Sequence, residues 1–596
     1  MEKKRTLVIE LTIIIFFGLI FFRLAYLHLT PPEWITSRTE GMRLLIQKSN
    51  PSRGQIVDRN GELFALDAPG YTMYADPKYI KKHGNVELVS SIISKELFYD
   101  KNILMNNLLN SKRAYYPLLI KKPETHRSFK NFSPRDNLSI TYKDKTGKNI
   151  VLNGVVLKKE RIRSYPKGLV LSHVLGYINF DRIGSGGIEQ SYHSYLLGKE
   201  GLRKGKKDAR KKEIYDAREI DRPAEDGAKI TLTIDQEIQN ITEDVIYQMF
   251  LKFRTKSAWA IVQDVQTGEI LAMASYPTFN PVEYNKVDEE WRRNRAISIN
   301  FDPGSTLKTA SIGIAIDKGV IDVEDQFDCE NGRWLYAGKY LNDWKNFKTL
   351  NVQEILKNSS NIGTAKIMLK LGDKDLYDGL KNFGFGEKLS INLPGEEKGQ
   401  LNDIKKWTKI SSSRIGIGQG ITATGLQMIT LYSTVANDGV MMKPYIVKKI
   451  ESSEGDLIHE YKPEVLRKPI SLATSQKLRE MLTTVVDTNG TGNKAKIKGY
   501  KIAGKTGTAQ KVKSSSEGGG YYNDKEVVSF IGFFPANNPQ ISILVMADEP
   551  SIRVNGKLPG GGTVCAPAFK EIAEHTIKYL KISPEGKRIY ITQAEN

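Results

Sequence analysis

The alternation of apolar and polar positions divides the chain into three stretches of different texture. The first, Leu7 to Leu29, is almost entirely apolar and has no polar side chain between Ile13 and Phe22. A helix that spans a bilayer needs about 20 such residues. Basic residues occupy positions 3–5, and such residues stay on the cytoplasmic side. We expect residues 1–30 to be a cytoplasmic tip and a single transmembrane anchor in the cytoplasmic membrane, with the bulk of the chain outside. A cleaved signal peptide is the alternative, but no small-x-small site follows the run.

The second stretch, residues 31–226, lacks long helical periodicity. Short apolar runs alternate with turn signals such as "DRNG" (Asp58 to Gly61) and "KDKTGKN" (Lys143 to Asn149). This pattern predicts a strand-rich α+β domain. Since it contains no constellation of catalytic residues, we interpret it as a pedestal or interaction domain.

In the third stretch, residues 227–582, strand patterns alternate with helical ones. Residues 257–277 predict a hairpin of two buried strands that turns at Thr267-Gly268, and residues 306–319 a helix that is apolar on nearly all sides. Strand patterns follow at 499–512, 527–536 and 541–548, and a helical pattern at 566–581. The fold class is therefore multidomain, and this part is an α/β domain whose sheet is flanked by helices. Residues 583–596 form a C-terminal tail.

Composition narrows the classes of function. The 88 Lys+Arg against 68 Asp+Glu give a formal charge of +20, but the charge is spread along the chain and no nucleic-acid module matches. The densest basic run, residues 203–212, is typical of a solvated hairpin or loop. The seven histidines form no ligand-spaced pair, so the sequence predicts neither a metal nor a cofactor. We expect Cys329 and Cys565 to be separate apolar fillers, with a disulfide as the alternative.

Ser305 stands out as a candidate nucleophile. It follows Pro303-Gly304, which suits a helix start, and Lys308 lies three residues on, one turn away on the same helix face. Backbone N–H groups at that helix end suit an oxyanion. A serine needs a base, and a lysine becomes one only when burial or a second positive charge lowers its pKa.

Two further segments offer the missing partners. In "IAGKTGTAQ" (Ile502 to Gln510), Lys505 supplies a second positive charge on a predicted strand. Gly504 and Gly507 indicate close approach of another backbone, and an extended peptide laid along the strand would be held by main-chain bonds. In "LKNSSNIGTAK" (Leu356 to Lys366), Ser359 and Asn361 fall at a break between two helical patterns. The predicted catalytic residues are Ser305, Lys308, Ser359 and Lys505, and the predicted substrate-binding residues are Asn361, Thr506, Gly507 and Thr508.

The three pieces in this order resemble the motifs of penicillin-binding proteins and β-lactamases. The likeness covers nearly the whole chain and is weakest between Tyr71 and Asn149. It departs at Gly425, where the family usually has proline, and at Cys565, where alanine is commoner. Five further stretches carry a resemblance to class B penicillin-binding proteins: "RGQIVDRNG" (53–61), "RSYPKGLVLSHVLGYIN" (163–179), "GGIEQSYHSYLLGKEG" (186–201), "IGQGITATGLQ" (417–427) and "SFIGFFPANNP" (529–539).

The resemblance implies a serine-type D-Ala-D-Ala transpeptidase that cross-links peptidoglycan stem peptides through an acyl-enzyme and is acylated by β-lactams. The spelling "GYINFD…GSGGIE" and the lack of C-terminal repeats resemble the division-specific, FtsI-type branch. The implied partners are a polytopic glycan polymerase of the SEDS type and other division proteins. Arg53 and Asp58 are expected to form a salt-bridged turn, against which the segment 163–168 lies.

Other functions stay open. The same catalytic domain serves β-lactamases and drug sensors, against which the long external spacer and the missing deacylating glutamate motif argue. An elongation-specific transpeptidase and a catalytically idle scaffold are the remaining alternatives. The acceptor amine and the oligomeric state do not follow from the sequence.

Overall fold

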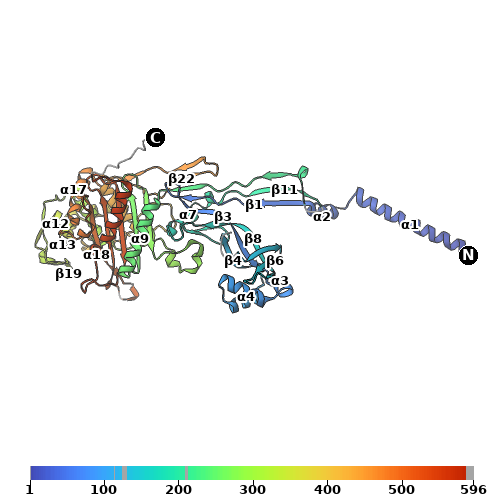
Figure 1. Ribbon diagram of the computed structural model, residues 1–596. Coiled ribbons are helices and arrows are strands. Elements are labelled where there is room, and N and C mark those ends of the chain that lie inside the picture. The colour runs from blue at the N-terminus through green and yellow to red at the C-terminus, as the bar shows by residue number, and fades with distance from the viewer. Residues whose placement is uncertain are drawn as a thin grey trace, which may run out of the picture. The chain divides into compact units, whose positions relative to one another are not determined.

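The computed structural model describes residues 2–112, 115–123, 130–208, 212–513, 515–517 and 519–584, in two compact units (Figure 1). The first unit comprises residues 1–52 and 197–227, and the second comprises residues 53–196 and 228–596. Most of the predicted tail, from residue 585 on, and residues 209–211 of the basic run lie outside the described residues.

The first unit contains the apolar helix and a small antiparallel sheet. Within the described residues, one helix is long and apolar enough to cross a membrane; it covers residues 3–29, and an 18-residue window in it has a mean hydropathy of 2.4. Strand β11 pairs with β1, β12 and β13. The elements are α1 (Glu2–Leu29), α2 (Glu33–Arg43), β1 (Leu44–Ser49), β11 (Gly201–Lys207), β12 (Glu213–Ile214) and β13 (Ile220–Arg222).

The part of the second unit before residue 197 mixes strands and helices, as the sequence predicts. Strand β3 pairs with β2, β4 and β8, and a separate sheet has the order β5-β6-β7. The strands are β2 (Ile56–Val57), β3 (Leu63–Ala75), β4 (Tyr116–Pro123), β5 (Phe132–Asp136), β6 (Ser139–Lys143), β7 (Asn149–Asn153), β8 (Val155–Ser164), β9 (Tyr177–Ile178) and β10 (Gly184–Ser185). The helices are α3 (Pro77–His83), α4 (Val86–Leu97), α5 (Lys101–Asn110), α6 (Ser172–Leu175), α7 (Gly187–Ser191) and α8 (His193–Leu197).

The sheet of β2 and β3 continues into strands from much later in the chain. Strand β14 (Lys229–Leu232) pairs in parallel with β2 and antiparallel with β22 (Val447–Glu451), which pairs with β23 (Leu457–Glu460). Backbone hydrogen bonds therefore join residues 53–196 of the second unit to the part that begins at residue 228, which contains the predicted catalytic residues and is called the catalytic part below.

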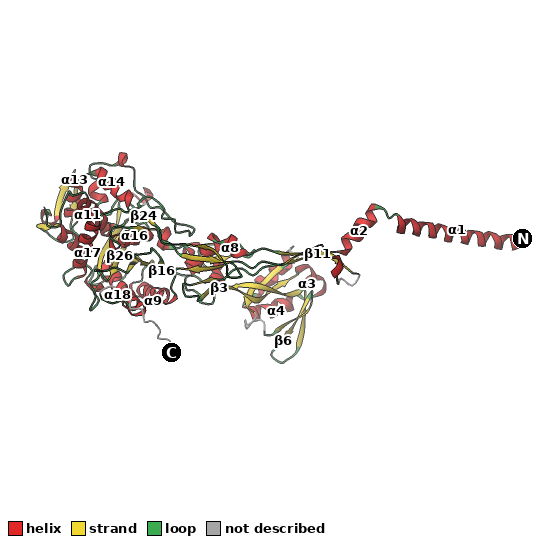
Figure 2. Ribbon diagram, turned by 90° about the horizontal axis from the view of Figure 1, so that it is seen from above, coloured by secondary structure: helices red, strands yellow, loops and turns green. Residues whose placement is uncertain are grey.

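The catalytic part is built on one antiparallel sheet with the order β16-β15-β27-β26-β25. Apolar side chains alternate between two cores: α9 and α18 cover one face, and α11 and α16 cover the other. Figure 2 shows β26 and β16 between these two helical layers. The strands are β15 (Ser257–Asp264), β16 (Ile270–Tyr276), β25 (Ala503–Val512), β26 (Tyr521–Phe534) and β27 (Ile541–Asp548), and the predicted hairpin of β15 and β16 is confirmed.

The helices of this part are α9 (Gln236–Phe253), α10 (Arg295–Ser298), α11 (Lys308–Asp317), α12 (Val352–Asn358), α13 (Asn361–Leu371), α14 (Asp373–Asn382), α15 (Ser411–Ile415), α16 (Gly425–Ala436), α17 (Leu472–Val486) and α18 (Gly561–Leu580). Three small strand pairs complete it: β17 (Gln326–Asp328) with β20 (Thr349–Asn351), β18 (Arg333–Tyr336) with β19 (Lys339–Asn342), and β21 (Met441–Met442) with β24 (Val465–Arg467). Residues 308–316 of α11 are buried, as the sequence predicts for a helix apolar all round.

The predicted ion pair between Arg53 and Asp58 is wrong. Arg53 Nε contacts the carboxylate of Glu189 at 2.5 Å, and the Asp58 carboxylate instead accepts backbone N–H groups of residues 60, 62 and 236. The prediction that the segment 163–168 lies against this turn is confirmed. Arg163 Nε binds the other oxygen of Glu189 at 2.6 Å, and its Nη1 donates to the Gly54 carbonyl. One buried carboxylate thus serves two buried guanidinium groups.

The two cysteines are separate, as expected. Cys329 and Cys565 are free, buried thiols in different apolar clusters. Gly425, the first residue of α16, is explained by crowding: a Cβ there would lie 2.9 Å from the Ala296 carbonyl oxygen and 3.3 Å from Nε1 of Trp259. The indole ring takes space that a larger residue at position 425 would need.

We predict that Glu189→Gln destabilises the protein by about 3–5 kcal/mol, because it leaves two buried arginines without their carboxylate. Urea unfolding of the purified chain measures this. The matched control is Glu62→Gln, whose side chain is 56% exposed and pairs with Lys167 at 3.3 Å. That change is expected to cost less than about 1 kcal/mol. Equal midpoints for the two variants would contradict the prediction.

Candidate active site

The segment that carries Ser305 is fixed by two glycines. Ser305 sits in a 3-10 turn, Gly304–Thr306, which leads directly into α11. Gly304 has φ +53°, a conformation that side chains disfavour, and its N–H donates to the Gly418 carbonyl. A Cβ on Gly418 would lie 2.1 Å from the Gly304 carbonyl oxygen. The backbone of Gly418 therefore packs against that of Gly304 and holds the turn that carries Ser305. This contact connects the stretch 417–427 to the site.

Ser305 is half-buried and lines a cavity of about 380 Å³. Asn361 and Thr508 line the same cavity, so the structure brings together residues from three distant segments. The predicted positions are confirmed: Ser359 and Asn361 stand at the break between α12 and α13, and residues 505–508 lie on β25.

Two buried lysines meet at Ser359. Lys308 Nζ donates to the Ser359 carbonyl at 2.7 Å and to Asn361 Oδ1 at 2.8 Å, and lies 3.4 Å from Ser359 Oγ. Lys505 Nζ donates to Ser359 Oγ at 2.9 Å and to the Thr506 carbonyl at 3.2 Å. A single hydroxyl thus bridges two amines from different elements. Lys308 makes these contacts rather than a hydrogen bond to Ser305, which lies one turn before it.

Burial governs the charge of this pair, because both lysine side chains are fully buried. Burial lowers the pKa of Lys308 to about 7, although the Asp343 carboxylate partly opposes this effect. Burial, followed by repulsion from Lys308, lowers the pKa of Lys505 well below its ordinary value. Both Nζ atoms lie close to the Ser359 hydroxyl, so two positive charges there would repel each other in a buried site. At neutral pH at least one of the two amines is therefore without its extra proton and can accept one.

Both side chains and backbone crowd the glycines of β25. A Cβ on Gly504 would lie 3.0 Å from the Ile531 carbonyl oxygen, and the backbone of Gly561 comes so near Gly507 that a Cβ on Gly561 would lie 2.6 Å from the Gly507 carbonyl oxygen, so the expected close approach of another backbone is confirmed. A Cβ on Gly507 would lie 2.3 Å from Ser529 Oγ and 3.0 Å from a methyl group of Thr306. A Cβ on Gly504 would meet the ring of Phe530 at 2.6 Å. Strand β25 forms the edge of its sheet, and among the described residues no strand pairs with its outer side, where an extended peptide could pair.

Asp343 is the site residue that the sequence reasoning missed. Its carboxylate accepts the Ser360 hydroxyl at 2.7 Å and the backbone N–H groups of Asn361 and Ile362 at the start of α13. The carboxylate therefore holds the turn that carries Ser359 and acts on Lys308 by charge. No local motif marks Asp343, because it lies 18 residues before Asn361 in a short connection after β19.

Comparisons with known proteins agree with this geometry. Residues 258–574 match the family model of the penicillin binding protein transpeptidase domain, and residues 48–232 match that of the penicillin-binding protein dimerisation domain. The chain is 31% identical over 592 residues to stage V sporulation protein D of Bacillus subtilis, covering 98% of this chain and 87% of that protein. It is 28% identical over 566 residues to peptidoglycan D,D-transpeptidase FtsI of Escherichia coli, covering 95% and 90%.

A solved structure shares the fold over most of the chain. Penicillin-binding protein 3 of Mycobacterium tuberculosis, complexed with aztreonam, superposes with a TM-score of 0.68 at 25% identity, covering 91% of this chain and all of that one. The chain belongs to the class B penicillin-binding proteins, with their dimerisation and transpeptidase domains. It is a peptidoglycan D,D-transpeptidase.

We predict that Asp343→Asn moves the acid limb of penicillin acylation to lower pH. Removing a negative charge disfavours the Lys308 ammonium, so its pKa falls further and the neutral amine persists at lower pH. The variant also loses about 1–2 kcal/mol of stability, because it weakens the hydrogen bonds at the start of α13. Stopped-flow acylation across pH and thermal melting measure the two effects. Asp328→Asn, an exposed turn carboxylate, is the matched control and leaves the limb in place.

Proposed function

We propose that Ser305 is the acylated nucleophile and that Lys308 is its general base. The observation that carries this proposal is the pair of buried lysines that meet at Ser359, with the pKa of Lys308 lowered to about 7. In the first step Ser305 Oγ attacks the carbonyl carbon of the penultimate D-Ala, and its proton passes to neutral Lys308. The backbone N–H groups at the helix start hold the oxyanion.

The bond to the terminal D-Ala then breaks, and its departing nitrogen takes a proton through Ser359, which Lys308 and Lys505 contact. An amine of a neighbouring stem peptide attacks the ester, forms the new amide and frees Ser305. In this scheme Lys505, Thr506 and Thr508 bind the terminal carboxylate. Asn361 and the backbone along Gly507 hold the peptide. β-Lactams follow the first half of the scheme and leave the serine acylated.

We further propose that the chain works at the septum in cell division, anchored by residues 7–29 with its bulk on the periplasmic side. In this proposal residues 31–226 are the pedestal and residues 227–582 the catalytic domain. The support is the apolar helix α1 and the 28% identity to a relative named FtsI over 95% of the chain. The pedestal is proposed to contact a polytopic glycan polymerase of the SEDS type, because this chain carries no recognisable polymerase signature.

A second candidate is wall synthesis during sporulation. It is favoured by one observation, the 31% identity over 98% of the chain to a relative named stage V sporulation protein D. The two candidates share the chemistry and differ in when and where the protein acts.

We predict that Ser305→Ala removes the covalent penicillin adduct. The free energy of unfolding of this variant is expected to lie within about 1 kcal/mol of the parent's, because only one partly exposed hydroxyl is lost.

Lys308→Arg is expected to slow acylation by at least about 100-fold, since guanidinium keeps its proton. In the parent, the rate rises with pH and levels off above about 7, where Lys308 is neutral. Mass mapping of the adduct and acylation kinetics measure these effects. An adduct on another residue would contradict the assignment of Ser305. An acylation rate of Lys308→Arg within about tenfold of the parent's would contradict the base role of Lys308.

A fluorescently tagged copy is predicted to localise at midcell in growing cells and to co-purify with a polytopic polymerase. A chain that lacks residues 1–30 is expected to be released from the membrane yet to label with penicillin, because all catalytic motifs lie beyond Lys229. Localisation along the side wall would favour an elongation role, and expression confined to sporulating cells would favour the second candidate. A mature N-terminus near residue 30 would show cleavage and contradict the anchor.

A further inference from the structure

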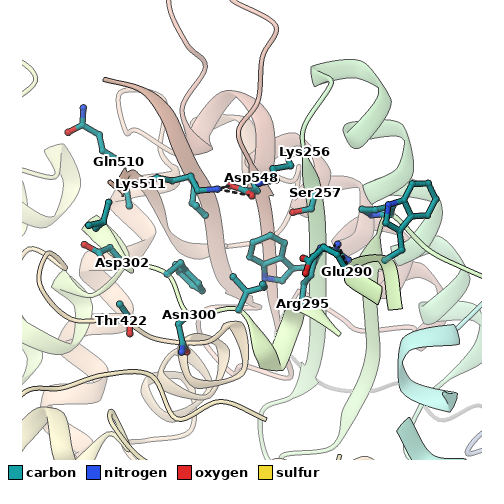
Figure 3. Close-up of a pocket in the computed structure, with 18 of the residues that line it drawn as sticks. Lys256, Ser257, Glu290, Arg295, Asn300, Asp302, Thr422, Gln510, Lys511 and Asp548 are labelled. Carbon is teal, nitrogen blue, oxygen red and sulfur yellow. Dashed lines mark hydrogen bonds and ion pairs between the residues drawn. The ribbon is translucent and has the colours of Figure 1, made fainter. Parts of the chain in front are cut away.

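A second cavity, of about 580 Å³, lies next to the 380 Å³ cavity that Ser305 lines, which we call the catalytic groove (Figure 3). Its walls come from the start of β15, the segment before Ser305 and the end of β25. The two cavities share three lining residues, Asp302, Ala509 and Gln510. They therefore meet three residues before the proposed nucleophile and directly past the strand segment proposed to bind the substrate.

The inner wall of this cavity is apolar. Trp259, Phe301 and Val527 are all buried, and the first two rings make an edge-to-face contact with centroids 6.4 Å apart. Charged side chains surround this wall: the carboxylates of Asp288, Glu290, Asp302 and Asp548, and the basic groups of Lys256, Arg295 and Lys511. A cavity that combines an apolar wall with placed polar groups is typical of a ligand site. The wall suits an aliphatic chain, and the polar groups around it decide which charge that chain carries.

Arg295 is the polar group that favours a negatively charged ligand in this cavity. The residue is 3% exposed, and its Nη2 donates to the Glu290 carbonyl at 2.8 Å. The nearest carboxylate, that of Glu290, is 3.5 Å away on a side chain that is 60% exposed. A buried guanidinium with so weak a counter-charge favours an added anion, and its planar fork suits a carboxylate.

The other two basic residues of the cavity are already compensated or exposed. Lys511 Nζ lies 2.6 Å from the Glu549 carboxylate and 3.0 Å from that of Asp548. The side chain of Lys256 is 65% exposed. In Figure 3, Lys511, Gln510 and Asp302 stand on one side of the cavity, and Arg295 and Glu290 stand on the opposite side. A ligand that enters from the catalytic groove must therefore cross the apolar wall to reach Arg295.

We propose that this cavity is a second substrate site, in which Arg295 binds a free carboxylate carried by an aliphatic side chain of the donor stem peptide. The inference rests on the proposed function, which places the terminal carboxylate of the donor near Thr506 and Thr508 and its scissile carbonyl at Ser305. The rest of the donor then runs along β25 toward Val512. Thr508 to Val512 spans about 13 Å of strand, which brings the residues upstream of the D-Ala pair to the shared mouth of the two cavities.

The experiment compares two donors with the full-length chain in detergent micelles. Both are synthetic peptide thioesters that end in a D-alanyl thioester, and they differ at one upstream residue, whose side chain ends in a carboxylate or in the matching primary amide. The rate of Ser305 acylation, followed by mass spectrometry, is expected to favour the carboxylate donor by about tenfold or more, as for a charge-assisted hydrogen bond.

Three variants assign that preference to the cavity. Arg295→Gln is expected to reduce it to within about twofold. Glu290→Gln removes the competing carboxylate and is expected to raise the preference by about threefold. Arg292→Gln removes the same charge from the same segment, but Arg292 donates to the Tyr177 hydroxyl and does not line the cavity, so this control keeps the parent preference.

Equal rates for the two donors in the parent, or a preference that survives Arg295→Gln, would overturn the inference. Penicillin labelling of Ser305 and thermal melting report whether each variant is folded. If Arg295→Gln fails to fold, the test rests on Glu290→Gln, which changes an exposed side chain. An unchanged ratio of the two donor rates in that variant rejects the site. Failure of the proposed function is distinguishable, since neither penicillin nor either thioester would then acylate Ser305.

Discussion

The catalytic part depends on one constraint: two lysine side chains are kept out of water around a single serine hydroxyl. Lys308 comes from α11, Lys505 from β25 and Ser359 from the turn between α12 and α13, so the site exists only when the sheet and these three helices are assembled. Burying an ammonium group is costly, and the protein meets that cost with several hydrogen bonds to each lysine and with the nearby Asp343 carboxylate. The same burial that is unfavourable for stability makes an amine available as a base at neutral pH.

A related constraint appears in the early part of the second unit, where two buried basic side chains share a carboxylate. There Glu189 is the carboxylate for both Arg53 and Arg163, and all three side chains are buried. The parallel pairing of β2 with β14 links this cluster to the catalytic part through main-chain hydrogen bonds. Residues 53–196 are thus joined by main-chain hydrogen bonds to the sheet that continues into β22.

The cavity beside the catalytic groove extends the same reasoning from chemistry to selectivity. The two buried lysines donate hydrogen bonds to fixed parts of the chain, whereas the nearest carboxylate to Arg295 is on an exposed side chain. Buried charges that the fold leaves short of a partner are places where a ligand gains affinity. Because this arginine lies across an apolar wall from the groove, it selects for chain length as well as for charge.

Much of this protein follows from the sequence by itself. The period of apolar residues determined the long apolar helix α1, the hairpin of β15 and β16 and the all-round burial of α11, because these patterns are local. The spacing of Ser305 and Lys308, and the pairs Ser359/Asn361 and Lys505/Thr506, marked the three segments that the fold brings together. Only the tertiary structure decided which partners meet: Arg53 pairs with Glu189 and not with Asp58, Asp343 holds the turn of Ser359, and Arg295 faces a cavity. These contacts join residues far apart in the chain, and their energies depend on burial, which a linear pattern of residues does not contain.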